Sequence, residues 1–285
     1  MKKKLLAIAI PASVIADTPH LREKTAKIGY IARAAAIFRV NEIIVYTDNP
    51  KVNQRRDQEF VTLLLQYLET PQYLRKRLFE LKPELQFAGI LPPLRTPHHP
   101  QQSSMRNLKA GDYREGIVLS KTEKAALVDI GVERPAVLLD TQVEVNQRLT
   151  LKITRAKLDQ TEVQISSKTE VPDYWGYFVS EETLPIRTWL ENRKFDLVIG
   201  TSKIAPDFQN SASALASRWH KATRVLLLFG APTRGLFDIA KDEGVRLEAL
   251  VDFVLNTVPD QGTETVRTEE ALLATLAIFN EHFRA

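Results

Sequence analysis

Three loops rich in glycine and polar residues are the strongest candidates for chemistry in this sequence of 285 residues. They cover residues 200–203, 230–235 and 257–265, and each follows a short apolar run typical of a strand. In open α/β sheets ligands bind outside the carboxyl ends of strands, and glycine lets backbone amides approach a ligand closely. One such loop is more often only a tight turn, but three together predict a ligand site.

Arg33 is a further candidate, on the helix expected over about residues 18–39. Gly29, Arg33 and Ile37 lie four residues apart on one face of that helix. A helical glycine costs about 1 kcal/mol relative to alanine, so Gly29 needs a reason. Access of a ligand to Arg33 is one reason, and a surface-paired arginine beside a close helix contact is the other.

The sequence lacks the residues that several other kinds of catalysis and binding require. The sequence has no cysteine, which excludes thiolate nucleophiles, disulfides and the usual structural zinc sites. There is no GxGxxG, no phosphate-binding loop ending in Lys-Ser or Lys-Thr, and no GxSxG around a serine nucleophile. Adjacent side chains diverge in most extended conformations, so the pair His98-His99 predicts no metal site.

The loops belong to an α/β pattern that a different pattern interrupts. Strands expected at residues 5–10 and 43–46 alternate with helices at about 18–39 and 53–69, and strands at 196–199, 224–229 and 253–256 precede a last helix at about 268–283. Five short strands between them, at 116–120, 125–130, 136–139, 148–154 and 161–166, predict a small barrel. The proline-rich residues 81–106 are interpreted as a linker. We therefore expect a discontinuous α/β domain, residues 1–95 and 171–285, with an inserted β-barrel, residues 96–170.

Charge is distributed unevenly along the chain. The net charge is +4, but residues 1–95 carry 16 basic and 9 acidic residues, a balance of +7, whereas residues 171–285 carry 12 and 16. Two explanations account for this asymmetry about equally well: residues 1–95 bind a polyanionic partner, or their basic residues lie on solvent-exposed helix faces. Residues 5–16 after the basic start imitate a signal peptide, but Pro11 interrupts the apolar run, so a buried strand and a cytoplasmic location are expected.

Three stretches resemble the SPOUT class of RNA methyltransferases, in the archaeal and eukaryotic branch with a barrel inserted in the knotted domain. They are residues 29–45, with Gly29-Tyr-Ile-Ala-Arg33, residues 228–236, with Phe229-Gly230-Ala-Pro-Thr-Arg-Gly235, and residues 256–271, with Asn256-Thr-Val-Pro259-Asp-Gln-Gly262-Thr-Glu-Thr265. The resemblance spans essentially the whole chain.

The resemblance implies a Rossmann-like α/β fold with a deep trefoil knot within residues 196–285, an inserted OB-like barrel, a homodimer and an RNA substrate. No metal is expected, because the sequence offers no suitable set of ligands. It also implies S-adenosylmethionine as cofactor and S-adenosylhomocysteine as product. The residues that would line the cofactor site are Ile199, Gly200, Thr201, Leu228, Phe229, Gly230, Gly235, Asn256, Thr257, Val258, Pro259, Gly262, Thr263 and Thr265. Arg33 would point toward the reacting nucleotide.

Three residues are candidates for the reaction itself. We expect Arg33 to stabilise a deprotonated oxygen or ring nitrogen and Arg267 to orient the nucleotide or a phosphate. Glu264 is a candidate proton acceptor, although the sequence favours a solvated loop carboxylate at this position. Ribosomal RNA with uridine N3 as the acceptor is the favoured substrate, while transfer RNA and ribose 2′-O remain open. The alternatives are a non-catalytic RNA-binding or ribosome-assembly protein with the same fold, and a small-molecule α/β enzyme.

Overall fold

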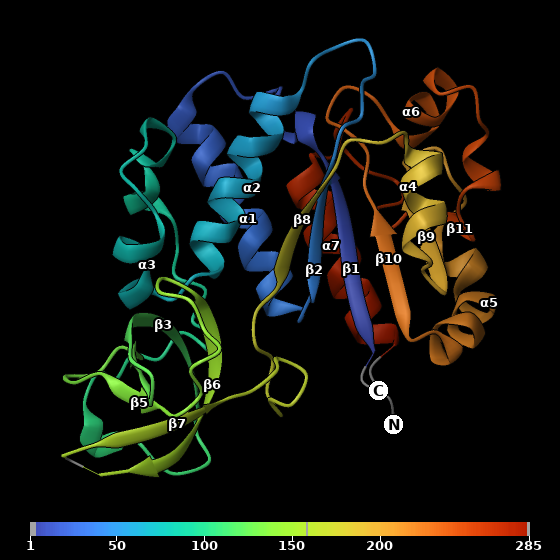
Figure 1. The fold of residues 1–285 in the computed structure, drawn as a ribbon. Helices are drawn as coiled ribbons and strands as arrows, with labels where there is room; N and C mark the ends of the chain where they lie inside the picture. Colours follow the sequence, from blue (N-terminus) through green and yellow to red (C-terminus); the bar gives the residue numbers. More distant parts are fainter. Residues whose placement is uncertain (1–3, 158, 284–285) are drawn as a thin grey trace. The chain divides into compact units, whose positions relative to one another are not determined.

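The computed structural model describes residues 4–157 and 159–283 and divides into two compact units (Figure 1). Unit 1 comprises Met1–Leu68, Pro83–Pro92 and Tyr177–Ala285, and unit 2 comprises Glu69–Lys82 and Pro93–Gly176. The boundaries differ from those expected, because residues 69–82, assigned from sequence to the α/β domain, cluster with the barrel.

A parallel sheet of six strands forms the centre of unit 1, in the order β11-β9-β10-β1-β2-β8. The strands are β1 (Leu5–Pro11), β2 (Glu42–Tyr46), β8 (Phe178–Glu182), β9 (Leu197–Thr201), β10 (Arg224–Leu228) and β11 (Phe253–Leu255). The central strands are continuous apolar runs because both faces of a parallel sheet are covered. Five strands confirm the sequence prediction. Strand β8 was missed because it is an edge strand with only Val179 buried, so it lacks an apolar run.

Helices accompany the strands in unit 1. They are α1 (Leu21–Ile37), α2 (Arg55–Glu69), α4 (Ile186–Arg193), α5 (Phe208–Lys221), α6 (Leu236–Asp242) and α7 (Thr268–His282), with 3₁₀ turns at Ala12–Ile15, Pro83–Leu85, Ala88–Ile90 and Leu247–Ala249. Helices α4 and α6 pack on one sheet face, where Trp189 and Leu236 share a core with Ala9 and Leu228. Helices α1 and α7 contact each other, and the buried Lys27 of α1 forms an ion pair with Glu269 of α7 at 3.2 Å.

Unit 2 contains a closed barrel with the strand order β3-β4-β5-β7-β6. Its elements are α3 (Gln72–Leu78), the 3₁₀ turn Met105–Asn107, β3 (Tyr113–Lys121), β4 (Ala126–Asp129), β5 (Ala136–Leu138), β6 (Arg148–Ala156) and β7 (Thr161–Ile165). A Cβ atom on Gly116 would lie 2.7 Å from side-chain atoms of both Leu151 and Val128, so only glycine allows this packing across the barrel. All five predicted barrel strands are confirmed.

The interpretation of residues 81–106 as a linker is wrong. His98 is fully buried in unit 2, and the Nε2 atoms of His98 and His99 lie 2.9 and 2.7 Å from the carbonyl oxygen of Glu69. The two rings therefore converge on one acceptor instead of diverging. Proline and polar residues are typical of linkers, and their contacts with a residue about 30 positions away leave no signal in local composition.

A buried ionic cluster joins these segments within unit 2. The guanidinium of Arg148 lies 2.7 Å from the Glu69 carboxylate and 2.6 Å from that of Glu115, and the indole of Trp175 donates to Glu115 at 2.6 Å. Burial alone would raise the pKa of Glu69, but the cationic Arg148 and Lys168 outweigh it and lower that pKa. Across the described residues, no helix has the length and apolar character needed to span a membrane.

Candidate functional site

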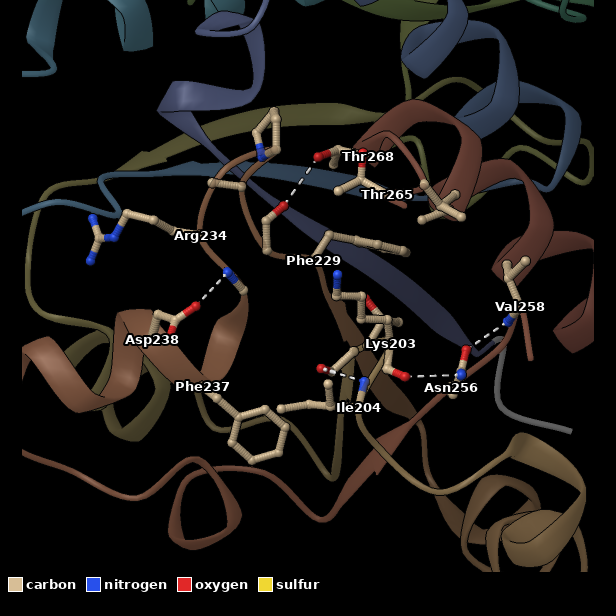
Figure 2. A pocket seen from close by; sticks show the side chains of 18 of the residues that line it. Lys203, Ile204, Phe229, Arg234, Phe237, Asp238, Asn256, Val258, Thr265 and Thr268 are labelled. Atoms are coloured by element: carbon tan, nitrogen blue, oxygen red, sulfur yellow. Dashed lines mark hydrogen bonds between the residues drawn. The ribbon is translucent and has the colours of Figure 1, made fainter. Parts of the chain in front are cut away.

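A cavity of about 370 Å³ opens at the carboxyl ends of β9, β10 and β11 (Figure 2). Its volume lies within the range of small-molecule sites. All three glycine-containing loops expected from the sequence contribute to its lining, which lies entirely in unit 1. The residues that line it are Thr201, Ser202, Lys203, Ile204, Phe229, Gly230, Ala231, Pro232, Thr233, Arg234, Gly235, Phe237, Asp238, Asn256, Thr257, Val258, Gln261, Thr265, Val266, Thr268 and Ala271.

The loop after β10 forms one wall and is held from both sides. The buried hydroxyl of Tyr46 donates to the carbonyl of Phe229 at 2.6 Å, and the hydroxyl of Thr268 donates to the carbonyl of Gly230 at 3.1 Å. A Cβ atom on Gly230 would lie 3.1–3.2 Å from backbone atoms of Arg234, Gly235 and Leu236. Glycine therefore suits the close return of the loop to the start of α6, because a larger residue would force the loop to shift.

Arg234 fixes the far end of that loop. Its guanidinium donates to the carbonyl of Asp48 at 3.1 Å and forms an ion pair with Asp242 on α6. The buried carboxylate of Asp48 in turn accepts hydrogen bonds from the Ser13 hydroxyl and the Gln54 amide, both at 2.8 Å. The loops that follow β1 and β2 thus brace the loop that follows β10.

The loops after β9 and β11 form the opposite wall and are tied to each other. The Asn256 amide donates to the carbonyl of Lys203 at 3.2 Å and accepts from the Val258 backbone at 2.9 Å. The Lys203 ammonium donates to the carbonyl of Glu264 at 3.2 Å, and the Gln261 amide donates to the same carbonyl at 3.0 Å. Residues 256–265 therefore form an ordered turn over the cavity even though their side chains are mostly exposed.

The structure places the predicted cofactor residues in two groups. Eight line the cavity: Thr201, Phe229, Gly230, Gly235, Asn256, Thr257, Val258 and Thr265. Six lie outside its lining: Ile199, Gly200, Leu228, Pro259, Gly262 and Thr263. Ile199 and Leu228 are fully buried within their strands. A Cβ atom on Gly200 would lie 3.1 Å from a methyl group of Leu236, so this glycine accommodates the packing of α6.

The three residues expected to act in the reaction lie outside the cavity lining. Arg33 is on α1, Arg267 directly precedes α7, and Glu264 is exposed on the loop whose carbonyl holds Lys203. The reason for Gly29 is a packing contact, because a Cβ atom there would lie 3.0 Å from Leu91 and 3.2 Å from Pro92. Access of a ligand to Arg33 is not needed to explain this glycine.

Several lining residues were missed from the sequence. Phe237 and Asp238 come from the first turn of α6, and Thr268 and Ala271 from the first turn of α7. A usable signal was available, because a helix that begins directly after a ligand-binding loop turns its first residues and free backbone amides toward the ligand.

The lining determines what the cavity can do. Ile204, Phe237 and Val258 offer apolar surface, while threonine hydroxyls, the Asn256 amide and loop backbone groups offer hydrogen bonds. No group of three or more metal-binding side chains occurs within residues 4–157 and 159–283. The lining also contains neither cysteine nor histidine. This composition suits the binding and alignment of a ligand that is part apolar and part polar.

Comparisons with known proteins agree with this arrangement. The family model described as "Putative RNA methyltransferase" matches residues 5–279. A mouse protein named 28S rRNA (uridine-N(3))-methyltransferase is 35% identical over 95% of this chain and 75% of its own length, and the human protein of that name is 34% identical over 95% and 77%. An uncharacterized protein of Halobacterium salinarum is 33% identical over 95% of this chain and 96% of its own. A solved structure titled "Crystal structure of an hypothetical protein" aligns over 100% of this chain and 81% of its own chain, with a TM-score of 0.39 and 11% sequence identity.

The match over residues 5–279 includes all three loops, the strands that present them and the inserted barrel. The two mammalian relatives exceed 30% identity over nearly the whole chain. The chain therefore belongs to this family of RNA methyltransferases and is an enzyme that methylates RNA.

Proposed function

We propose that the enzyme transfers a methyl group from S-adenosylmethionine to N3 of a uridine in ribosomal RNA. The observation that carries the proposal is the cavity that the loops after three neighbouring parallel strands form together. The choice of ribosomal uridine N3 rests on the names of the mouse, human and fly relatives, which are 33–35% identical to this chain.

The residues of the cavity fit this cofactor. Its volume of about 370 Å³ suits a small nucleoside derivative, and its accessible apolar side chains, Ile204, Phe237 and Val258, suit an adenine ring and a thioether chain. Gly230 lets the loop backbone close tightly at a point where a Cβ atom would lie only 3.1–3.2 Å from backbone atoms. When bound, the sulfonium cofactor supplies an electrophilic methyl group, so the protein's main tasks are alignment and the handling of one proton.

We assign the handling of the nucleotide to Arg33 and Arg267, which lie outside the lining of the cavity. A guanidinium presents several donors in a fixed plane and suits a uracil ring that loses its N3 proton. Glu264, on the loop over the cavity, is the proposed proton acceptor. Arg33→Ala should lower turnover or RNA affinity, whereas Arg22→Ala, at an exposed position of the same helix, should change neither.

We further propose that two copies of the chain associate through α1 and α7. Tyr30 and Ile37 lie on the same face of α1 and are 66% and 54% exposed, and Leu273 of the adjacent α7 is 47% exposed. Arg33 lies between Tyr30 and Ile37 on that face of α1, within reach of RNA bound to the second copy of the chain. Light scattering should give twice the mass of 32.3 kDa, and Tyr30→Glu should lower it.

The family resemblance also motivates two structural proposals. We propose that residues 196–285, which include β9, β10 and β11 of the parallel sheet and the loops after them, form a trefoil knot. The closed barrel of unit 2 is proposed to be an OB-like module that docks RNA. Its removal should raise the KM for RNA and leave cofactor binding intact.

Methyl transfer with a deuterated donor tests the proposed reaction. Ribosomal RNA from a strain that lacks the enzyme is incubated with the protein and methyl-deuterated S-adenosylmethionine, and its nucleosides are analysed by mass spectrometry. We expect deuterated 3-methyluridine and no other labelled nucleoside. Label in a 2′-O-methyl nucleoside, or in transfer RNA alone, would contradict the proposed acceptor.

A further inference from the structure

Lys203 differs from the other charged side chains of the cavity in its partners. The charged residues in the lining are Lys203, Arg234 and Asp238. Arg234 is neutralised by its ion pair with Asp242, and the Asp238 carboxylate accepts the backbone N–H of Gly235 at 3.1 Å. Lys203 forms no ion pair within 4 Å among the described residues, and its recorded partner is the neutral carbonyl of Glu264.

Lys203 is exposed, and its ammonium lies between the loops after β9 and β11. The Asn256 amide holds the Lys203 backbone carbonyl at 3.2 Å (Figure 2). The Nζ atom of Lys203 donates to the carbonyl of Glu264 at 3.2 Å. An ammonium has three N–H donors, so the bond to Glu264 leaves two for another acceptor. Because the side chain bridges the loops after β9 and β11, the ammonium lies at the cavity wall, where an anionic group of a bound ligand can reach it.

We propose that Lys203 binds the carboxylate of the amino-acid portion of S-adenosylmethionine and of S-adenosylhomocysteine. This inference rests on the proposed function, because it assumes that this cofactor occupies the cavity. The adenosine then lies against the apolar side chains of the lining, and the amino-acid end lies toward the loops after β9 and β11. Lys203 therefore discriminates the intact cofactor from fragments that lack a carboxylate.

The same ammonium chemistry also suits an RNA phosphate. The cavity favours the carboxylate, because Lys203 lies between two loops of a pocket of small-molecule size, whereas a duplex or loop of RNA presents its phosphates over a broad surface. The salt dependence of RNA binding distinguishes an RNA phosphate from the cofactor carboxylate as the partner of Lys203. Loss of one phosphate contact lowers the slope of log affinity for RNA against log salt by about 1 and leaves the affinity for S-adenosylhomocysteine unchanged.

Calorimetry with two ligands tests the inference on the full-length protein. S-adenosylhomocysteine carries the carboxylate, and 5′-methylthioadenosine retains the adenosine and thioether without it. For Lys203→Met, we expect the Kd of S-adenosylhomocysteine to rise about 5- to 30-fold, as for a charge-assisted hydrogen bond at a partly exposed site, and the Kd of methylthioadenosine to change less than twofold. Lys203→Arg should retain most of the affinity. Lys241→Met, an exposed lysine on α6, is the matched control and should change neither Kd.

The outcomes separate this inference from the proposed function. If the wild-type protein binds neither ligand, the proposed cofactor itself is wrong. If it binds both and Lys203→Met weakens them equally, or weakens neither, the cofactor stands and the role of Lys203 is refuted. If only RNA affinity falls, with the lower salt slope, Lys203 contacts phosphate and the assignment to the carboxylate is overturned.

Discussion

Replacing Gly230 with alanine tests the geometry of the cavity with a single methyl group. The added Cβ atom would lie 3.1 Å from the backbone nitrogen of Leu236, 3.2 Å from the carbonyl oxygen of Arg234 and 3.2 Å from the Cα atom of Gly235. All three are backbone atoms, so no side-chain rotation relieves the contacts. The loop must move by a few tenths of an ångström as a unit.

The expected loss of ligand affinity follows from the hydrogen bonds that hold this loop in place. Overpacking of this kind costs about 1–3 kcal/mol. The carbonyls of Phe229 and Gly230 are held by Tyr46 and Thr268, so the ligand-free protein relaxes by shifting the loop away from these partners. Binding then has to restore the original position. At about 1.4 kcal/mol for each tenfold change, we expect the Kd for S-adenosylhomocysteine to rise about 5- to 100-fold.

Titration calorimetry measures this effect, and Gly262→Ala is the matched control. Gly262 lies on the loop after β11, and a Cβ atom there has no neighbour within 4 Å. We expect that variant to bind within twofold of the wild type. The reasoning fails if Gly230→Ala, shown to be folded by circular dichroism, binds as tightly as the wild type, or if Gly262→Ala loses as much affinity.

Three further predictions concern stability, measured by urea unfolding. Tyr46→Phe removes the 2.6 Å bond to the Phe229 carbonyl and should cost about 1–2 kcal/mol, and no change would show that the bond contributes nothing. Arg148→Met leaves two buried carboxylates without their shared cation and should lower the free energy of unfolding by about 3–5 kcal/mol. The control Arg155→Met, at a more exposed ion pair, should lower it by less than about 1 kcal/mol. Equal losses in the two variants would argue against the buried cluster. The folded-state pKa of Glu69 lies below its unfolded value of about 4.3, so its stabilisation is complete above that pH and is lost as pH falls through the folded pKa. Glu69→Gln should therefore flatten the acid side of the stability profile, and an unchanged acid slope would contradict this assignment.

The strands could be predicted from the sequence because their burial leaves a local signal. Strands β1, β9 and β10 are short apolar runs, and the barrel strands alternate with turn residues. The loops after β9, β10 and β11 followed from the strands, since the carboxyl ends of parallel strands lie at one sheet edge. Strand β8 has no such run and was missed.

Contacts between distant residues could not be predicted in the same way. The bond from Tyr46 to Phe229 joins residues 183 positions apart, and Tyr46 resembles any other buried strand residue in the sequence. The burial of His98 depends on Glu69, at the end of a helix that seemed to belong wholly to the α/β domain. Lys203 was part of a predicted loop, but only the folded arrangement of the neighbouring loops shows that its ammonium pairs with a neutral carbonyl and with no carboxylate of the described residues.

A crystal structure of the protein with S-adenosylhomocysteine tests the central claim most directly. The account predicts the ligand in the cavity formed by the loops after β9, β10 and β11, with its adenosine against Phe237 and Ile204 and its carboxylate within 3.5 Å of the Lys203 ammonium. Ligand density elsewhere on the protein, with this cavity holding only solvent, would contradict the account.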